Sequence, residues 1–306
     1  MPITMSTPKT TRLTLDDMDH LSIGKKARLQ RLLYDYGPGN GTLLFLPIDQ
    51  GLEHGPVDFF ENTDAQDPDF QCRLALEGKY SAIVFHIGLA EKYMKKYAGK
   101  VPLVVKINGK TNIPNDDAAF SSLTSTVEDA VRLGADAIGY TLYVGSSAQD
   151  MDIQQFNEVR REAERYGMPI IVWAYPRGTS VKAKGGQDSP YAIEYAARVA
   201  CELGADVVKI NYPNVNAPGN ANSPKPYDTL KLTEEEATRR AVQAAGKTLV
   251  VFSGGSKVSD EDLVSKARMG MEAGAAGLIF GRNMWQRPMD NALNVSRRVS
   301  EMMSSL

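Results

Sequence analysis

A lysine inside an apolar run is the sharpest candidate for chemistry in this sequence. Lys209 lies in "DVVKINY", a run typical of a buried strand, where an ammonium group is costly. A lone lysine in such a place more often lays its stem along the core and carries its head to solvent. A neutral amine, however, attacks carbonyl carbons. Lowering its pKa from about 10.4 toward about 7 takes roughly 4–5 kcal/mol of burial or nearby positive charge.

Other reactive side chains follow the ends of other apolar runs. "WAYPRG" places Trp173, Tyr175 and Arg177 at alternate positions, so they share one face of a strand that continues that far. "PIDQGLEH" contributes Asp49, and "VVKING" contributes Lys106. Each residue alone commonly serves packing or loop capping, but an amine, a phenol, a guanidinium, an indole and a carboxylate together favour a reactive site.

Two glycine-containing turns, "FSGGSK" and "IFGRN", follow the last two apolar runs. Gly254 and Gly255 allow close approach of the backbone to a ligand, and Arg282 adds a charge-assisted donor. Turns after the seventh and eighth strands of a barrel often bind phosphate. A lone "SGG" is commonly only a turn, so the prediction of a phosphate site depends on both turns together. The predicted site also includes Ser253 and Gly281, which lie beside these residues.

The elements that must position these residues alternate regularly along the chain. Eight short apolar runs predict strands at 42–48, 81–87, 101–107, 136–143, 168–175, 206–212, 248–254 and 276–281. Helix-like segments lie between them, including 125–134, 152–167, 191–204, 233–246 and 259–274. We therefore predict a single (β/α)8 TIM barrel. The alternative is an open doubly wound sheet, whose G-x-G-x-x-G fingerprint "DQGLEHG" does not match.

The predicted organisation is an N-terminal extension, residues 1–40, followed by a catalytic barrel domain, residues 41–306. The extension is expected to be helical, with Thr14 as an N-cap and Gly37 as a stop, and disordered over residues 1–10. Two polar runs, 176–190 and 213–231, follow strands and are long enough to be binding loops or lids at the C-terminal face of the barrel.

Composition narrows the class of protein. The 306 residues carry a net charge of −2 with no basic stripe, which argues against nucleic acid as a partner. No apolar run reaches the roughly 18 residues of a membrane span, and the start of the sequence lacks the apolar core of a secretion signal. The two cysteines are too few for a disulfide framework and suit a reducing compartment. We expect a cytoplasmic protein with no membrane partner.

Metal chemistry and serine hydrolysis are poorly supported. The three histidines, His20, His54 and His86, share no ligand-type spacing, so no metal site is expected. The nucleophile elbow G-x-S-x-G is absent.

Six motifs in order resemble the archaeal/bacterial-type class I fructose-1,6-bisphosphate aldolases. They are "LPIDQGLEHGP", "VVKINGKTN", "IVWAYPRG", "GADVVKINYP", "FSGGSK" and "GLIFGRN", and they run from about residue 40 to residue 285. The resemblance implies a barrel enzyme of glycolysis and gluconeogenesis that forms a Schiff base and needs no metal or other cofactor.

The same resemblance implies a role for each matching residue. Lys209 matches the imine-forming lysine, Tyr175 the proton donor and acceptor, and Asp49 and Trp173 residues that line the reacting centre. One phosphate site is matched by Gly254, Gly255, Gly281 and Arg282. Arg177 matches a contact to a second phosphate or hydroxyl, and Lys106 lies in a family motif with its role left open.

Members of the family are usually homo-oligomers, which we expect here, and their substrates are phosphorylated sugars. Two alternatives stay open: a Schiff-base lyase or transferase for another phosphorylated ketose, and a non-catalytic barrel that binds phosphosugars. A metal-dependent aldolase is a further possibility to be checked with a chelator.

Overall fold

A closed barrel of parallel strands forms the centre of the protein. The structure is a computed structural model that describes residues 11–306. Within them the barrel consists of β1 (Leu43–Ile48), β2 (Ala82–His86), β3 (Leu103–Lys106), β6 (Ala137–Val144), β7 (Ile170–Pro176), β8 (Val207–Ile210), β9 (Leu249–Ser253) and β10 (Gly277–Ile279). β1 pairs with β10, which closes the sheet. All eight predicted strands are present, so the (β/α)8 barrel is confirmed and the open doubly wound sheet is wrong.

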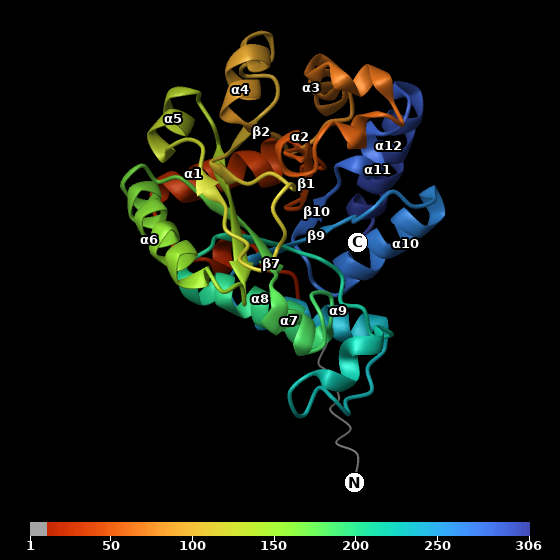
Figure 1. Cartoon of the computed structure of the whole chain (residues 1–306). Coiled ribbons are helices and arrows are strands. Elements are labelled where there is room, and N and C mark those ends of the chain that lie inside the picture. Colours follow the sequence, from red (N-terminus) through yellow and green to blue (C-terminus); the bar gives the residue numbers. More distant parts are fainter. Residues whose placement is uncertain (1–10) are drawn as a thin grey trace.

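Helices surround the barrel as an outer ring (Figure 1). They are α3 (Pro68–Glu77), α4 (Ile87–Tyr93), α5 (Val127–Arg132), α6 (Gln149–Arg165), α8 (Pro190–Leu203), α9 (Glu234–Ala244), α10 (Asp260–Glu272) and α12 (Met289–Ser304). The five helical segments predicted from the sequence correspond to α5, α6, α8, α9 and α10. Three short helices directly follow strands: α2 (Gln50–Glu53), α7 (Thr179–Ala183) and α11 (Arg282–Trp285).

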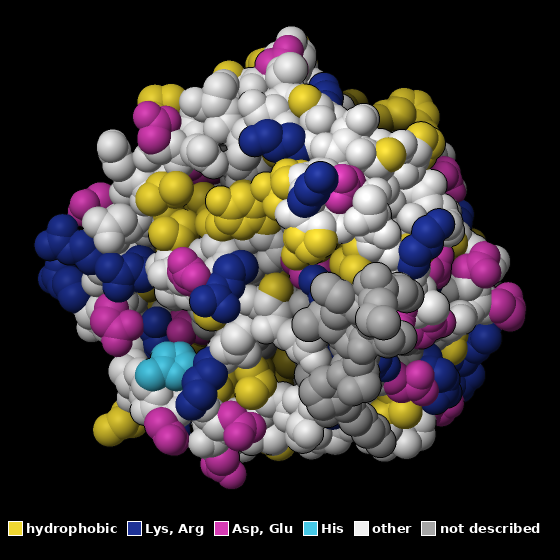
Figure 2. All heavy atoms as spheres, turned by 90° about the horizontal axis from the view of Figure 1, so that it is seen from below, with side chains coloured by type: hydrophobic (Ala, Val, Ile, Leu, Met, Phe, Trp, Pro, Cys, Tyr) yellow, Lys and Arg dark blue, Asp and Glu magenta, His cyan; other side chains and the backbone are white. Residues whose placement is uncertain are grey.

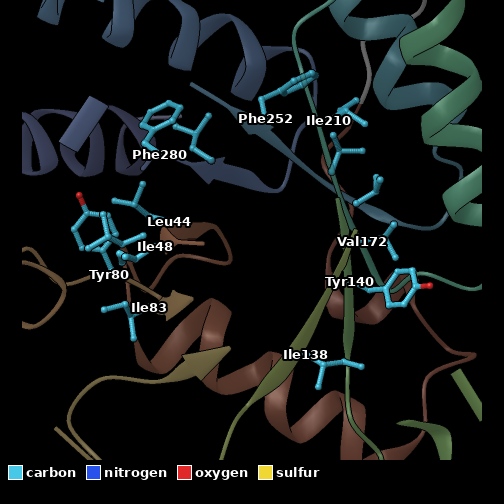
Figure 3. Close-up of a cluster of buried hydrophobic side chains, with 14 of the residues drawn as sticks. Leu44, Ile48, Tyr80, Ile83, Ile138, Tyr140, Val172, Ile210, Phe252 and Phe280 are labelled. Carbon is cyan, nitrogen blue, oxygen red and sulfur yellow. The ribbon is translucent and has the colours of Figure 1, made fainter. Parts of the chain in front are cut away.

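One face of every strand packs against these helices. Figure 3 shows part of this outer core, where Leu44, Ile83 and Val172 lie with aromatic rings such as Phe252 and Phe280. Because the opposite face of each strand is also buried, the strands have continuous apolar sequences instead of alternating ones.

The inward faces of the strands bring the predicted reactive residues to one level. The register pairs Trp173 on β7 with Lys209 on β8, and Lys106 on β3 with Gly139 on β6. A Cβ atom added to Gly139 would lie 2.8 Å from the Trp173 ring and 2.9 Å from Cδ of Lys106. Glycine at this position therefore leaves the room that the indole and the lysine stem occupy.

The N-terminal segment packs against the barrel interior at the end opposite the site. Thr14 caps a 3-10 turn (Leu15–Asp17) through a capping box, and α1 (Ile23–Gln30) continues into a π turn (Arg31–Asp35). Leu29, Leu32 and Leu33 share a buried cluster with inward residues of the strands. The predicted helical character and the Thr14 cap are confirmed. The disorder predicted for residues 1–10 lies outside the described residues, and the domain division at residue 40 stays a prediction.

Two ion pairs attach this segment to the turns that enter strands. Lys25, which is buried, lies 3.1 Å from a carboxylate oxygen of Asp206, and Arg31 lies 2.8 Å from one of Asp136. Asp136 and Asp206 occupy equivalent places in the repeated "LGAD" sequences that precede β6 and β8. In both repeats, therefore, the aspartate of the turn forms an ion pair with a cation of the N-terminal segment.

Long loops cover the C-terminal face of the barrel. The predicted loop 176–190 contains α7, and the predicted loop 213–231 contains a 3-10 turn (Pro218–Asn222). A third long loop, residues 110–121, was not predicted. It joins β4 (Asn108–Gly109) to β5 (Ser122–Leu123), which pair in antiparallel fashion.

The surface mixes charges of both signs on the face that can be followed in Figure 2. There, Lys and Arg side chains are interspersed with Asp and Glu, and apolar side chains gather in a band. On this face the arrangement agrees with the small net charge of the chain. Among residues 11–306, no helix has the length and hydropathy that a bilayer crossing requires.

Candidate active site

A polar cavity of about 680 Å³ opens at the C-terminal ends of the strands. Most of the sequence-predicted site residues line it: Asp49, Tyr175, Arg177, Lys209, Ser253, Gly254, Gly255, Gly281 and Arg282. The structure therefore brings these residues together around one space. Lys106 and Trp173 are fully buried and lie outside the lining, next to Lys209.

Lys209 on β8 presents a buried amine to this cavity. Its side chain points inward, only 6% of the residue is exposed, and Nζ donates a hydrogen bond of 2.6 Å to Oη of Tyr175. Burial lowers the pKa of Lys209 to about 8, assisted by the positive charges of Lys106 and Arg282 and opposed by the carboxylates of Asp49 and Glu53. A pKa of about 8 leaves roughly a tenth of the amine neutral at pH 7.

Tyr175 on β7 is the hydrogen-bond partner of that amine. Burial raises the pKa of its phenol, and the carboxylates of Asp49 and Glu53 raise it further, so these surroundings hold it protonated. The guanidinium of Arg177 lies 5.0 Å from the centre of the Tyr175 ring. A positive charge above the ring and a second at Lys209 would both favour the phenolate when it forms.

Lys106 on β3 has a different environment, although it lies as deep. Its Nζ donates to Glu53 at 2.6 Å and to Asp49 at 3.4 Å. Burial alone would lower the pKa of Lys106, but the carboxylates of Glu53 and Asp49 outweigh burial and raise it. The structure thus distinguishes the two lysines: Lys106 is a paired cation, and Lys209 is the amine whose proton is loosely held.

The indole of Trp173 lies close to both lysines. Nζ of Lys106 lies 5.0 Å from a ring centre of Trp173, and Nζ of Lys209 lies 5.4 Å from it. Both cations can therefore interact with the face of one ring. Direct contact of Trp173 or Lys106 with a substrate stays a prediction.

Glu53 is a site residue that sequence reasoning missed. It lies on α2, four residues after Asp49, and both carboxylates reach Lys106. Burial raises the pKa of Glu53, whereas Lys106 and Lys209 outweigh burial at Asp49 and lower its pKa. The i, i+4 spacing in "DQGLE", which places two side chains on one side of a helical turn, was the available signal.

The glycine turns after β9 and β10 line the cavity beside Lys209. Asn283, which was also missed, donates from Nδ2 to the carbonyl oxygens of Gly254, Gly255 and Ser256 and so holds the first turn. A Cβ atom on Gly254 would lie 2.8 Å from that same Nδ2 atom. Ser253 donates to Asn211 at 2.6 Å, which links β9 to the end of β8.

Arg282 begins α11 and lines the cavity beside these turns. Its Nε lies 3.9 Å from Asp58, which also contacts Nδ1 of His54 at 2.7 Å. His54 lines the cavity, whereas His86 is largely buried and burial lowers its pKa to about 4. In the described part of the chain, no group of three or more His, Cys, Asp or Glu residues is arranged to hold a metal ion.

The barrel and the lysine amine at its mouth define the class of protein, an aldolase of the Schiff-base type. The family model "DeoC/LacD family aldolase" matches residues 43–287, and the chain belongs to this family. It is therefore a carbon–carbon lyase, as the sequence predicted.

Individual relatives agree with this assignment. The "Fructose-bisphosphate aldolase class 1" of Thermoproteus tenax is 39% identical over 86% of this chain and 89% of the relative. The "Fructose-bisphosphate aldolase/6-deoxy-5-ketofructose 1-phosphate synthase" of Methanocaldococcus jannaschii is 32% identical over 85% of this chain and 80% of the relative.

A solved structure is similar over almost the whole chain. It is an archaeal fructose-1,6-bisphosphate aldolase with the catalytic Lys covalently bound to the carbinolamine intermediate of the substrate. It shares 36% identity and a TM-score of 0.77, and the match covers 90% of this chain and 99% of that chain. The resemblance recognised in the sequence is thus confirmed.

Proposed function

We propose that this protein is a class I fructose-bisphosphate aldolase that reversibly cleaves fructose 1,6-bisphosphate to dihydroxyacetone phosphate and glyceraldehyde 3-phosphate. The observation that carries the proposal is the buried Lys209 amine, whose pKa is lowered to about 8 and which lies 2.6 Å from the Tyr175 hydroxyl. The similar aldolases support the choice of substrate, since their names specify fructose bisphosphate.

Imine formation is the first half of the proposed reaction. Neutral Lys209 attacks the C2 ketone, and the carbinolamine loses water to give a cationic imine that withdraws electrons from C3. Asp49, whose carboxylate stays ionised because two lysines lower its pKa, orients water or relays protons in this step. Lys106 is protonated and paired, so it supports the carboxylates and does not attack.

Cleavage is the second half. Tyr175 first passes its phenol proton through water to the ionised carboxylate of Asp49, and the resulting phenolate accepts the C4 hydroxyl proton. The C3–C4 bond breaks, and its electrons pass into the imine to form an enamine while glyceraldehyde 3-phosphate leaves. Tyr175 then returns a proton to C3, and hydrolysis of the imine releases dihydroxyacetone phosphate. Tyrosine is a weak base, but the iminium charge on its hydrogen-bond partner and Arg177 above its ring stabilise the phenolate.

Phosphate binding holds the reacting carbons in place. Ser253, Gly254, Gly255, Gly281 and Arg282 bind the C1 phosphate in this proposal, and Arg177 binds at the other end of the substrate. Binding energy from the phosphates fixes C2 next to Lys209 and the C4 hydroxyl next to Tyr175.

Borohydride trapping tests the proposal directly. Reduction with dihydroxyacetone phosphate should give a stable adduct on the peptide that contains Lys209, and an adduct on Lys106 would contradict the assignment. Tyr175→Phe should slow carbon–carbon cleavage by about 10²–10⁴-fold while the adduct still forms. Full cleavage activity in that variant would remove Tyr175 from its role, and loss of activity in EDTA would indicate a metal-dependent reaction instead.

A second candidate substrate is another phosphorylated ketose. The Methanocaldococcus jannaschii relative carries the name of both an aldolase and a 6-deoxy-5-ketofructose 1-phosphate synthase. A panel of ketose mono- and bisphosphates, assayed for cleavage and for transfer to other aldehydes, separates the two activities. A barrel that only binds phosphosugars would bind members of the panel and give no adduct.

We further propose that the enzyme works in the cytoplasm as a homo-oligomer. The two cysteines, Cys72 and Cys201, are unpaired, which suits a reducing compartment. Light scattering of the purified chain would give the oligomeric state, and a monomeric mass at micromolar concentration would contradict the second half of this proposal.

A further inference from the structure

Two cations at one side of the cavity share a carboxylate of the protein itself. Nζ of Lys110 lies 2.9 Å from one oxygen of Asp116, and Nε of Arg177 lies 3.4 Å from the other. The side chains of Lys110 and Arg177 are only 17% and 20% exposed, and all three residues line the same cavity as Lys209. An internal carboxylate therefore bridges two partly buried cations inside the site.

This pair of cations lies on the opposite side of Lys209 from the glycine turns. Arg177 follows β7 and Lys110 follows β4, whereas the glycine turns follow β9 and β10, and β8 with Lys209 lies between β7 and β9. Arg177 also lies over the ring of Tyr175, the residue proposed to act at C4. On the proposed function, on which this inference rests, Lys110 and Arg177 therefore face the C6 end of the substrate.

The charges of Lys110 and Arg177 favour the replacement of the Asp116 carboxylate by a phosphate group. Two cations that bridge a carboxylate offer the donors that bind phosphate oxygens. With Asp116 in place the three side chains carry a net charge of +1, and without it +2. A phosphate dianion that approached the intact group would be repelled by Asp116, so both anions cannot hold the same two cations at close range.

The chain around Asp116 belongs to a loop outside the closed barrel. Residues 110–121 form the loop of a hairpin whose ends are fixed by the pairing of β4 with β5. The neighbouring Asp117 accepts hydrogen bonds from Thr179 and Ser147, which lie outside this loop. Asp116 itself is bound only through its ion pairs among the described contacts, and its side chain is 38% exposed.

We propose that Asp116 occupies the binding place of the second phosphate in the empty enzyme and is displaced when that phosphate binds. The carboxylate keeps Lys110 and Arg177 oriented between turnovers, and its return helps to expel the phosphorylated aldehyde product. Asp116 is thus a specificity-determining residue for the C6 phosphate, and Lys110 joins Arg177 as its ligand.

Kinetics with two substrates test this proposal. Asp116→Asn removes the competing charge and both of its ion pairs, so the KM for fructose 1,6-bisphosphate should fall about fivefold, the scale of a partly exposed electrostatic interaction. The KM for fructose 1-phosphate, which has no C6 phosphate, should stay within about twofold of wild type. The matched control is Asp117→Asn, which should change neither value. Lys110→Met should raise the KM for the bisphosphate, and the double variant should no longer respond to Asp116→Asn.

The contrary outcomes are distinct. An unchanged or increased KM for the bisphosphate in Asp116→Asn, or an equal fall for both substrates, would overturn the proposal. Absence of any trapped lysine adduct in the wild-type enzyme would refute the proposed function and not the exchange itself. In that case calorimetric titration with inorganic phosphate still tests whether Asp116 competes with phosphate. The Asp116→Asn variant should bind phosphate more tightly than wild type does, and the Asp117→Asn variant should bind it as wild type does.

Discussion

Two buried lysines beside the Trp173 ring show that the interacting side chains, and not the extent of burial, decide which amine is reactive. Lys106 and Lys209 both lie over Trp173, and both are almost completely buried. Lys106 has carboxylate partners that raise its pKa, whereas the hydrogen-bond partner of Lys209 is a neutral phenol and its pKa falls to about 8. A site can therefore keep a permanent cation beside a nucleophile without a metal or an unusual residue.

The lowered pKa of Lys209 predicts that the catalytic lysine destabilises the fold. Its pKa is 10.5 when free and about 8 here, so at pH 7 the charged form costs about 3 kcal/mol at roughly 1.36 kcal/mol per unit. Lys209→Met should raise the free energy of unfolding at pH 7 by up to about that amount. The gain should shrink above pH 8 and vanish above about 10.5, where the unfolded lysine is neutral too.

Urea unfolding at several pH values measures this effect. Lys95→Met, on the surface, is the matched control and should show no such pH dependence. If Lys209→Met were less stable than wild type at pH 7, the amine would be stabilised by contacts that outweigh its burial.

At the scale of single elements, the short helix α2 delivers two carboxylates to one lysine. Asp49 precedes the helix and Glu53 ends it, so one turn separates them. Their pKa values move in opposite directions, raised by burial at Glu53 and lowered by the lysines at Asp49. One short helix and the residue that caps it thus supply both a carboxylate that can carry a proton and one that stays ionised.

Glu53 is therefore predicted to relay the proton that the departing C2 hydroxyl needs when the carbinolamine loses water, because burial favours brief protonation of its carboxylate. Glu53→Gln keeps the shape but cannot give up a proton in this way, so adduct formation should slow by about 10²-fold. The substitution also removes a carboxylate that raises the pKa of Lys209, which leaves more neutral amine, so a slower rate cannot come from the nucleophile.

Quenched-flow borohydride trapping would measure that rate. Glu77→Gln, an exposed residue of α3, serves as the control and should trap at the wild-type rate. Equal trapping rates for Glu53→Gln and wild type would assign the proton to another group.

Strand β6 contributes by leaving space. Since a Cβ atom at Gly139 would lie within 3 Å of both Trp173 and Lys106, Gly139→Ala should cost about 1–3 kcal/mol of stability. It should also lower the amount of trapped adduct by shifting the indole that supports Lys209. Gly88→Ala, in α4, has no atom within 4 Å of the added methyl group and should leave both thermal stability and trapping intact. If Gly139→Ala had the stability and the adduct yield of wild type, the Trp173 ring would be able to move aside freely.

Sequence reasoning recovered the strands because each is a continuous apolar run buried on both faces, as at Leu103–Lys106. It also recovered the residues at strand ends, because side-chain alternation fixes which ones share a face. It missed Glu53, Asn283 and Asp116, whose partners lie far away in sequence: Lys106, the backbone of the turn 254–256, and Arg177. The "DQGLE" spacing places Glu53 beside Asp49, but its contact with Lys106, like those of Asn283 and Asp116, depends on barrel closure and loop paths that no local pattern encodes.

At the scale of the whole molecule, the N-terminal segment closes the end of the barrel that lies opposite the active site. Lys25 is buried between Asp206 and Glu164, at 3.1 Å and 3.0 Å. Lys25→Met would leave Asp206 buried and unpaired, and removal of one partner of a buried pair typically costs about 3–5 kcal/mol. We expect a marked fall in melting temperature with unchanged kcat in the fraction that stays folded.

Arg31→Met is the control for that prediction. Its partner Asp136 is also largely buried, but the Arg31 side chain is 44% exposed, so water replaces it more readily and the fall should be smaller. A loss of kcat that exceeds the loss of folded protein in Lys25→Met would show that this end of the barrel communicates with the catalytic residues.

The same two ion pairs set an order of events during synthesis. Arg31 and Asp136 are 105 residues apart, and Lys25 and Asp206 are 181 apart. Helix α1 and the π turn after it therefore cannot complete these contacts until residue 206 has been made. Until then Leu29, Leu32 and Leu33 lack much of the cluster that buries them. A nascent chain halted before residue 206 should bind chaperones through this helix, and the full-length chain, whose strands complete the cluster, should not.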